Sequence, residues 1–245
     1  MNKRIFAACL LAFILFLASP VVSDSGTLSE DVRDHLTHTV GTEAVSERGS
    51  RVGMPAVSHL VLEFYEARKF QPAWSDDYGL SPIAFDLLSV VRAARQEGLN
   101  PDDYNPGRIE EMLAGFYKDR NGTGAFDAAK LAELDLMLTE TFFLYASHIH
   151  EGRVDHEKVY PDWVVGAKNA DLPEILSEAA LSQDIQKAIA DLAPPYPGYA
   201  ALRNELIAYQ AVAEKGGWPW VPPGAKIMKG SRGKRVAALR QRLTA

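Results

Sequence analysis

The longest apolar pattern in the chain lies between residues 126 and 150. Apolar side chains recur there at the spacing of one helix face: Leu131, Leu134, Leu138, Phe142, Tyr145 and Ile149. After the first two turns the opposite side is also apolar, through Leu136, Met137, Phe143 and Leu144. A helix that is apolar nearly all round lies inside a bundle rather than on its surface. We therefore predict a buried central helix over residues 126–150, with other helices packed around it.

Shorter amphipathic patterns on both sides of this stretch predict the surrounding helices. They lie near residues 55–68, 82–97, 106–116, 172–179, 183–192 and 199–215. The last of these is expected to bury Leu202, Leu206, Tyr209 and Ala213. No segment sustains the alternation of apolar and polar residues that is typical of a strand. The predicted fold class is all-α: an irregular multi-helix bundle around a buried central helix, with essentially no sheet.

Polar residues before several of these patterns are expected to cap the helices. Ser81, Asn105, Asp171 and Ser182 each precede a predicted helix, and such side chains accept hydrogen bonds from the first free backbone amides. Gly98 is expected to end the helix over residues 82–97 in a left-handed conformation. The polar, glycine-rich stretch 118–124 is predicted to be a loop.

The N-terminal segment Met1–Ser23 has the features of a secretory signal. Lys3 and Arg4 precede an apolar run over residues 5–17, and a small-residue cleavage site follows at residues 21–23. The run is short for a membrane span of about 20 residues, which favours cleavage over anchoring. We therefore expect an exported, periplasmic protein whose mature chain has no stable membrane span.

Residues 24–52 are rich in Ser, Thr, Gly and charged residues and lack aromatic residues. This composition favours a flexible leader, with a short helix near residues 30–39 as the alternative. The main helical domain is expected over residues 53–217.

The C-terminal residues 218–245 differ in composition from the predicted domain. Pro219, Pro222 and Pro223 prevent a helix in their first part. A short basic helix is predicted after them, with one apolar stripe formed by Val236, Leu239 and Leu243. We expect a linker followed by the truncated start of a second helical module.

Charge and cysteine content exclude several classes of function. The net charge is −6, and removal of Lys3 and Arg4 lowers it to −8. An acidic chain without a dominant basic stripe is not expected to bind nucleic acid. The single cysteine, Cys9, lies inside the predicted signal. The mature chain would then hold no disulfide, no thiolate zinc site and no cysteine nucleophile.

A histidine-rich cluster follows the central helix and suggests two interpretations. His148, His150 and His156, with Glu151 or Asp155, have the residue types of a zinc or copper site. Residues two apart on a helix, however, point in directions about 200° apart, which separates the first two histidines. We favour a role at the helix C-terminus, where these imidazoles and Arg153 complement exposed carbonyl groups. No metal or cofactor is predicted.

Two carboxylate pairs and a set of aromatic residues are the remaining candidates for chemistry. Asp102–Asp103 and Glu110–Glu111 are interpreted as solvated helix starts rather than as the facing acids of a glycosidase. The Gly-x-Ser-x-Gly motif of serine hydrolases is absent. Aromatic residues at helix ends either form a saccharide-stacking surface or, as we favour, pack the joints between helices. They are Tyr65, Trp74, Tyr104, Trp163, Trp218 and Trp220, of which Trp74, Tyr104, Trp218 and Trp220 are the candidate binding residues.

Four segments, taken in order, resemble one known family. They are Phe64-Tyr65 with Phe70-Gln-Pro-Ala-Trp74; Ala94-Arg-Gln-Glu-Gly-Leu-Asn-Pro-Asp-Asp-Tyr104; His148-Ile-His-Glu-Gly-Arg-Val-Asp155 with Trp163; and Tyr199-Ala-Ala-Leu-Arg203 leading to Gly216-Gly-Trp-Pro219. Their order is similar to that of the helical scaffold domain in the large periplasmic L,D-transpeptidases, enzymes that cross-link peptidoglycan. Residues 224–243 are similar to the start of the peptidoglycan-binding module that follows in that family.

The resemblance implies a role in cell-wall biogenesis but not a catalytic site. In that family a later domain carries catalysis through a Ser-His-Gly-Cys motif, and neither Ser58-His59 nor Ser147-His148 is followed by Gly-Cys. No catalytic residue is carried over, and we do not expect this chain to be an enzyme by itself. Two roles stay open: the scaffold portion of an L,D-transpeptidase-like protein, or a free-standing accessory that binds peptidoglycan or a cell-wall synthase. A carboxylate-based hydrolase acting on cell-wall sugars is the third possibility.

Overall fold

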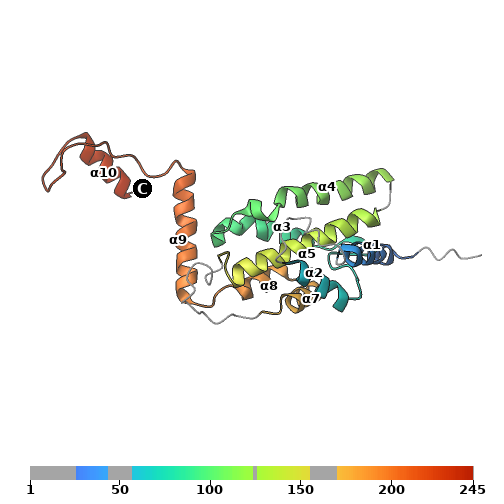
Figure 1. Ribbon diagram of the computed structural model, residues 1–245. Coiled ribbons are helices and arrows are strands. Elements are labelled where there is room, and N and C mark those ends of the chain that lie inside the picture. The colour runs from blue at the N-terminus through green and yellow to red at the C-terminus, as the bar shows by residue number, and fades with distance from the viewer. Residues whose placement is uncertain (1–25, 44–56, 124–125, 155–169, 245) are drawn as a thin grey trace, which may run out of the picture.

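A computed structural model describes residues 26–43, 57–123, 126–154 and 170–244 (Figure 1). The helices are α1 (Leu28–Glu43), α2 (Ser58–Ala67), α3 (Ile83–Arg92), α4 (Pro106–Thr123), α5 (Ala128–His150), α7 (Leu172–Ser182), α8 (Ile185–Leu192), α9 (Pro197–Glu214) and α10 (Lys234–Thr244), with short 3-10 helices η2 (Ala93–Glu97) and η3 (Pro101–Tyr104). Strands β1 (Ser75–Asp76) and β2 (Gly79–Leu80) form an antiparallel hairpin in which Ser75 pairs with Leu80. The predicted all-α class is confirmed.

Helix α5 is the centre of the fold, as its apolar pattern predicts. Asp127 caps its first turn, because Oδ1 accepts hydrogen bonds from the backbone amides of Ala129 (3.0 Å) and Lys130 (3.2 Å). All six residues of the predicted stripe are buried. Helices α1, α2, α3, α4, α7 and α8 surround and contact α5 (Figure 1). Their buried apolar side chains form one continuous core with those of α5.

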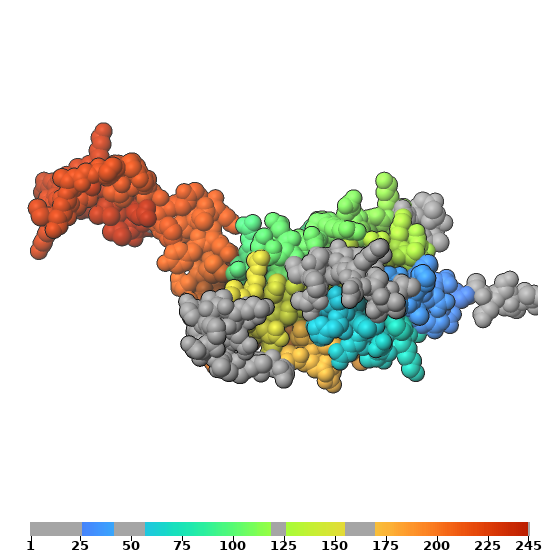
Figure 2. Space-filling model, viewed as in Figure 1, coloured from blue at the N-terminus to red at the C-terminus, as the bar shows by residue number. Residues whose placement is uncertain are grey.

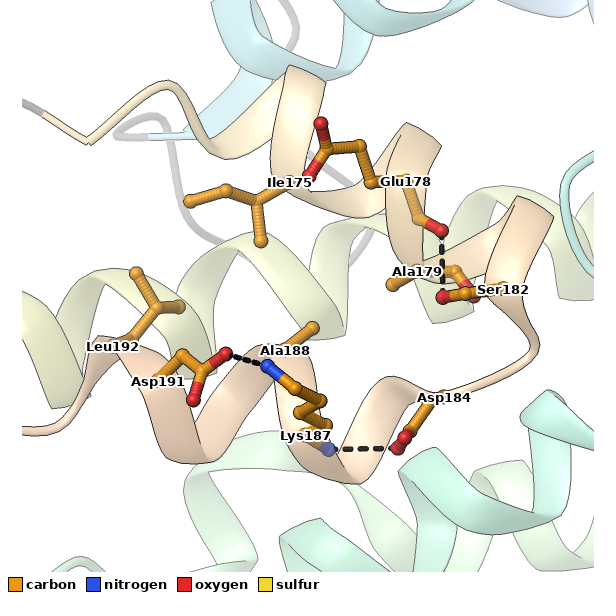
Figure 3. Close-up of a pocket in the computed structure, with 9 residues that line it drawn as sticks. All are labelled: Ile175, Glu178, Ala179, Ser182, Asp184, Lys187, Ala188, Asp191 and Leu192. Atoms are coloured by element: carbon orange, nitrogen blue, oxygen red, sulfur yellow. Dashed lines mark hydrogen bonds and ion pairs between the residues drawn. The ribbon is translucent and has the colours of Figure 1, made fainter.

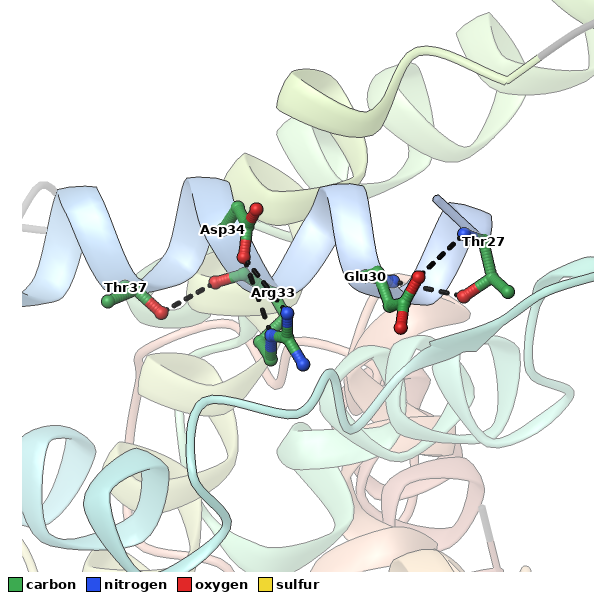
Figure 4. Close-up of polar contacts among 5 residues, drawn as sticks. All are labelled: Thr27, Glu30, Arg33, Asp34 and Thr37. Atoms are coloured by element: carbon green, nitrogen blue, oxygen red, sulfur yellow. Dashed lines mark hydrogen bonds and ion pairs between the residues drawn. The ribbon is translucent and has the colours of Figure 1, made fainter. Parts of the chain in front are cut away.

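Helix α1 shows that residues 28–43 of the predicted flexible leader are helical, which favours the alternative of a short helix near residues 30–39. Val32, Leu36 and Val40 recur every four residues and are buried against the core, where α1 lies along α5. At the start of the helix the amide of Glu30 donates to Thr27 Oγ1 (3.3 Å), and the amide of Thr27 donates to Glu30 Oε2 (3.0 Å; Figure 4). This reciprocal pair is a capping box. The polar composition of this segment did not predict an ordered helix. The helix is stabilised by packing on α5, which supplies most of the apolar surface of the contact.

The predicted N-caps divide into correct and incorrect ones. Asp171 Oδ1 accepts from the amide of Glu174 (2.9 Å), as expected. Ser81 instead donates from Oγ to Gln183 Oε1 (2.8 Å), and Ser182 donates back to the carbonyl of Glu178 (2.8 Å). Asp184 caps α8 in place of Ser182, accepting from the amide of Lys187 (2.9 Å). The serine hydroxyls therefore serve tertiary and intrahelical contacts rather than helix starts.

Two helix ends also differ from the prediction. Helix α3 gives way to the 3-10 helix η2 after Arg92, although Gly98 ends the segment in the predicted left-handed conformation, with φ 77°. Asn105 has a left-handed backbone, with φ 47°, before α4 begins at Pro106. Helix α4 continues to Thr123, so the expected loop over residues 118–124 is wrong for most of its length.

Helix α9 does not bury the side chains that its pattern predicts. It stands across the end of the bundle (Figure 1), and none of its residues is buried. Leu202 is 73% exposed and Tyr209 is 56% exposed. The main contact of α9 with the bundle is at η2. We call the described residues from 26 to 196 the body; α9 connects this body to the C-terminal residues.

Residues 215–244, which we call the arm, extend beyond α9 and away from the body (Figure 2). The chain turns at Gly216 and Gly217, both in the left-handed region. Arg235 holds the following loop to α10 by donating to the carbonyls of Pro222 (2.7 Å) and Ala225 (2.5 Å). No side chain of the arm is buried. Among the described helices of the whole chain, none combines the length and apolar character needed to cross a membrane.

Candidate functional site

A buried carboxylate, Asp135, organises the centre of the body. The chain leaves α2 through Lys69 and Phe70, two successive residues in the left-handed region, and then runs past the middle of α5. There the amides of Ala73 (3.1 Å) and Trp74 (2.9 Å) donate to the Asp135 carboxylate. The Tyr65 hydroxyl, at 2.6 Å, donates to it as well. One side chain therefore holds the end of α2 and the following segment against α5.

Thr139, one turn along α5, completes this network. Trp74 Nε1 donates to Thr139 Oγ1 (2.9 Å), which also lies 2.9 Å from the Tyr65 hydroxyl. Trp74 is only 1% exposed, so its role is in the core. The structure thus contradicts Trp74 as a saccharide-stacking residue and agrees with the packing role that we favoured for the aromatic set. The indole needs a buried hydrogen-bond acceptor, and Thr139 provides it.

Burial shifts the ionisation of the two acids in this network. Removal from water raises the pKa of the Asp135 carboxyl, although the donated hydrogen bonds oppose this shift. Burial and the neighbouring carboxylate together raise the pKa of Tyr65 well above its usual value. Tyr65 therefore stays a neutral donor, and no substrate-accessible surface reaches either group. The network is structural rather than catalytic.

A second aromatic contact lies at the C-terminal end of α5. Tyr104 is fully buried, and its hydroxyl lies 2.9 Å from His148 Nδ1. Partial burial and the charge of Arg153 lower the pKa of His148, while burial raises the pKa of Tyr104 to about 12. This hydrogen bond ties Tyr104 to the last turn of α5. Tyr104, like Trp74, is a core residue, so its assignment as a candidate binding residue is wrong.

The same corner corrects the electrostatic interpretation of the histidines. The lowered pKa of His148 disfavours a positive charge on its ring at the end of α5, whereas the cation beside Tyr104 is Arg153, which pairs with Asp103 at 2.8 Å. Asp155 and His156 lie outside the described residues. Within residues 26–43, 57–123, 126–154 and 170–244, no three side chains of metal-binding type gather into a possible site.

One acid of each predicted carboxylate pair forms an ion pair between elements. Asp103 pairs with Arg153, and Glu110 of α4 pairs with Arg92 of α3. Neither pair of acids faces another across a described cleft. The geometry therefore offers no support for a two-carboxylate hydrolase.

Glu97 forms the joint between the body and α9. Its carboxylate accepts from the Tyr199 hydroxyl (2.6 Å) and from Arg203 Nε (2.5 Å). Arg203 Nη2 also donates to Gln96 Oε1 (3.2 Å), and Gln210 Nε2 donates to the carbonyl of Arg95 (2.7 Å). Burial, followed by the hydrogen bond to Glu97, raises the pKa of Tyr199 to about 12. Hydrogen bonds and an ion pair thus connect α9 to the body at this joint.

A shallow pocket of about 290 Å³ lies between α7 and α8 (Figure 3). Ile175, Ala188 and Leu192 contribute apolar surface, while Lys187 and Asp191 form an ion pair at its edge. Asp184, also on its lining, is the N-cap of α8. These charged groups are engaged with one another or with the backbone, so the pocket presents no nucleophile and base within reach of each other.

The other two candidate binding residues lie on the arm. Trp218 is 38% exposed, and its ring centroid lies 5.4 Å from that of Tyr209 on α9. Trp220 is 71% exposed. The structure therefore separates the four candidates: Trp74 and Tyr104 are inside the body, and only Trp218 and Trp220 are accessible. Trp163, from the wider aromatic set, lies outside the described residues.

Asp135 is the residue that the sequence interpretation missed. It lies in the middle of the apolar stretch as Ala132-Glu-Leu-Asp-Leu-Met137, where an acid is unexpected. A carboxylate on the buried side of a helix requires hydrogen-bond donors from elsewhere in the chain. An acid in the middle of an apolar helical stretch was therefore the feature of the sequence that could have predicted a buried polar contact.

The described part of the chain is a helical bundle in which the prominent polar and aromatic side chains connect one element to another. A family model described as a scaffold domain matches residues 59–206, which are 148 of the 245 residues. The chain belongs to this scaffold-domain family. No curated protein and no solved structure matches the chain. The matched range begins in α2 and ends in α9, so it includes the three polar joints but neither α1 nor the arm.

Proposed function

We propose that this chain is the exported scaffold portion of an L,D-transpeptidase-like protein of peptidoglycan cross-linking. Its body would hold a catalytic domain and cell-wall synthesis proteins in position. The observation that carries the proposal is the structural use of the segments that resemble that family. Trp74 is bound to α5, Tyr104 to His148, and Tyr199 and Arg203 to Glu97. These segments build a rigid support, which is what a scaffold requires.

The first test is an L,D-transpeptidase assay on tetrapeptide stems with the chain purified after export. We expect no acyl transfer from the chain alone, because its only cysteine lies in the predicted signal. The Cys9→Ser variant is the control for any unprocessed product. Acyl transfer by this variant would contradict the proposal.

The second test asks whether the chain acts as a support. A catalytic domain of the L,D-transpeptidase class is added separately, and cross-linked product is measured with and without the chain. A scaffold should bind that domain and increase its cross-linking. An unchanged yield, together with no association in sedimentation, would contradict this role.

One observation favours the accessory role as a second candidate. Trp218 and Trp220 are accessible on the arm, where flat indole rings are suited to stacking on sugars. Sedimentation with purified sacculi tests it: the Trp218→Ala, Trp220→Ala double variant should lose retention. Tyr78→Ala is the matched control, since Tyr78 is an 88% exposed aromatic residue on the body. Equal retention of both variants would exclude the arm as the glycan contact.

A further inference from the structure

The charges of the chain are separated between its two regions. Residues 215–245 contain eight Lys or Arg and no Asp or Glu. Residues 1–214 contain the other 18 basic residues and all 32 acidic residues. The net charge of −6 therefore hides a segment of +8 attached to one of −14. The expectation that no dominant basic region exists is wrong for the arm.

Large apolar side chains lie among these cations and are open to solvent. Trp220 is 71% exposed, Met228 is 64% exposed, and Leu243 at the end of α10 is 75% exposed. Val236 and Leu239 fall on the same side of α10 as Leu243 at helical spacing, and both are only partly buried. The arm thus combines an accessible apolar stripe with a high positive charge.

The arm keeps its shape without using most of its charge. Arg235 and Arg242 donate to carbonyl groups of the loop before α10, including that of Pro219 at 3.2 Å. Lys226, Lys229 and Lys234 are exposed and take part in no ion pair within the described part of the chain. These three ammonium groups are therefore available to an external anionic partner.

We propose that the arm binds the surface of an anionic lipid bilayer. Basic amphipathic helices with exposed Trp, Leu and Met lie in the headgroup region, where apolar groups leave water and cations meet phosphate. A purely polar polyanion offers charge but no place to bury Met228 and Leu243. The partner that matches both properties is a membrane surface rich in acidic phospholipid.

The charge and the geometry of the rest of the molecule are compatible with an arm that lies on a membrane surface. The body carries the acidic residues and is repelled by an anionic surface. Helix α9 has 18 residues and is about 27 Å long, so it separates the body from a bound arm. Its contact with the body is the polar joint at Glu97, outside the arm. This proposal rests on the arm alone and stands whether or not the scaffold acts in peptidoglycan cross-linking.

The test is co-sedimentation of the exported chain with vesicles. Mixed phosphatidylglycerol–phosphatidylcholine vesicles should bind it, pure phosphatidylcholine vesicles should not, and added salt should weaken binding. The Lys226→Gln, Lys229→Gln, Lys234→Gln variant should bind about 100-fold more weakly, because each cation near an anionic surface contributes about 1 kcal/mol. Lys69→Gln, Arg95→Gln, Lys118→Gln is the matched control, since these three cations are exposed on the body.

The apolar part of the proposal has its own readout. Vesicles should shift tryptophan emission to shorter wavelength, and Trp220→Ala should reduce both this shift and the binding, by about tenfold for the latter. Circular dichroism of each variant verifies that α10 is still helical. Equal loss in the body control and the arm variant would overturn the proposal. The proposal would also be overturned if the chain were retained on sacculi but not on vesicles, or if it did not bind anionic vesicles at all.

Discussion

The body and the arm are built by opposite means within one chain. The body is acidic and has a continuous apolar core, into which even its conspicuous polar groups are drawn as hydrogen-bonded joints. The arm is basic, has no buried side chain, and keeps its loop in place by bonds from arginine to backbone carbonyls. Apolar burial is the main stabilising contribution to a fold. The body therefore carries the stability of this protein, and the arm carries accessible surface.

Helices α1 and α9 show that similar amphipathic patterns can give either a buried or an exposed helix face. Helix α1 has four apolar residues along one face, and three of them, Val32, Leu36 and Val40, lie in the core, with Leu28 packed against it. Helix α9 has four apolar residues at helical spacing, and Leu202 and Tyr209 among them are mostly exposed. The two helices differ in what they pack against: α1 lies along α5, whereas the main contact of α9 with the body is the short helix η2. An amphipathic pattern thus predicts a helix but not the surface that covers it.

The largest expected effect compares one substitution in the two regions. Leu138→Ala should lower the free energy of unfolding by about 2–5 kcal/mol, because Leu138 is fully buried at the centre of α5. Leu202→Ala makes the same change on the exposed face of α9 and should stay within about 0.5 kcal/mol. Urea denaturation followed by circular dichroism measures both. Similar losses in the two variants would show that α9 is covered in solution.

The next effect concerns the buried polar joint. Asp135→Asn should cost about 1–3 kcal/mol, since an amide turns one of its N–H groups toward the backbone amides that now donate to the carboxylate. Asp184→Asn is the matched control, because asparagine is also a good N-cap and Asp184 is exposed. A neutral result at Asp135 would mean that the network does not hold the chain after α2 to α5.

The pH dependence of this variant sharpens the same point. The pKa of Asp135 is raised in the fold, so folding favours its protonated form. Its contribution to stability is fully present below its ordinary value of 3.8 and is lost as pH rises through the raised pKa. The stability difference between the native chain and Asp135→Asn should therefore decrease over that rise. A difference that grows with pH would show that the carboxylate is held ionised at lower pH than burial implies.

Sequence patterns predicted contacts between residues that are close together in the chain, but not contacts between residues that are far apart in it. The apolar stretch around Leu138 predicted α5 because almost every residue there must avoid water. Asp171 was predicted as a cap because its partner, Glu174, is three residues away. The partners of Asp135 are Ala73 and Trp74, about 60 residues earlier, and no local pattern connects them.

The candidate site was predicted in part for the same reason. Exposure of an aromatic residue depends on what packs over it, so Trp74 and Trp220 look alike in sequence, although one is 1% and the other 71% exposed. Both lie within two residues of a proline in a connecting segment. The preference for joint packing was correct for Trp74 and Tyr104. Only Trp218 and Trp220 keep accessible surface for a ligand.

The smallest expected effect concerns the joint that separates the two regions. Arg203→Ala should change the free energy of global unfolding by less than about 1 kcal/mol, because the ion pair with Glu97 is partly open to solvent. Backbone amides of α9 should nevertheless exchange hydrogen faster, since α9 has no buried side chain to hold it. Hydrogen exchange followed by mass spectrometry measures this, with Asn204→Ala on the exposed side of α9 as the control.

Arg203→Lys decides whether charge or geometry holds the joint. Lysine keeps the positive charge, but its single ammonium group does not reproduce the two-pronged contact of the guanidinium with Glu97 and Gln96. If geometry is decisive, Arg203→Lys should exchange nearly as fast as Arg203→Ala in α9, while α5 stays protected in both. Protection of α9 by lysine would assign the joint to charge alone. Unchanged exchange in both variants would mean that Tyr199 and Gln210 are sufficient to fix α9 to the body.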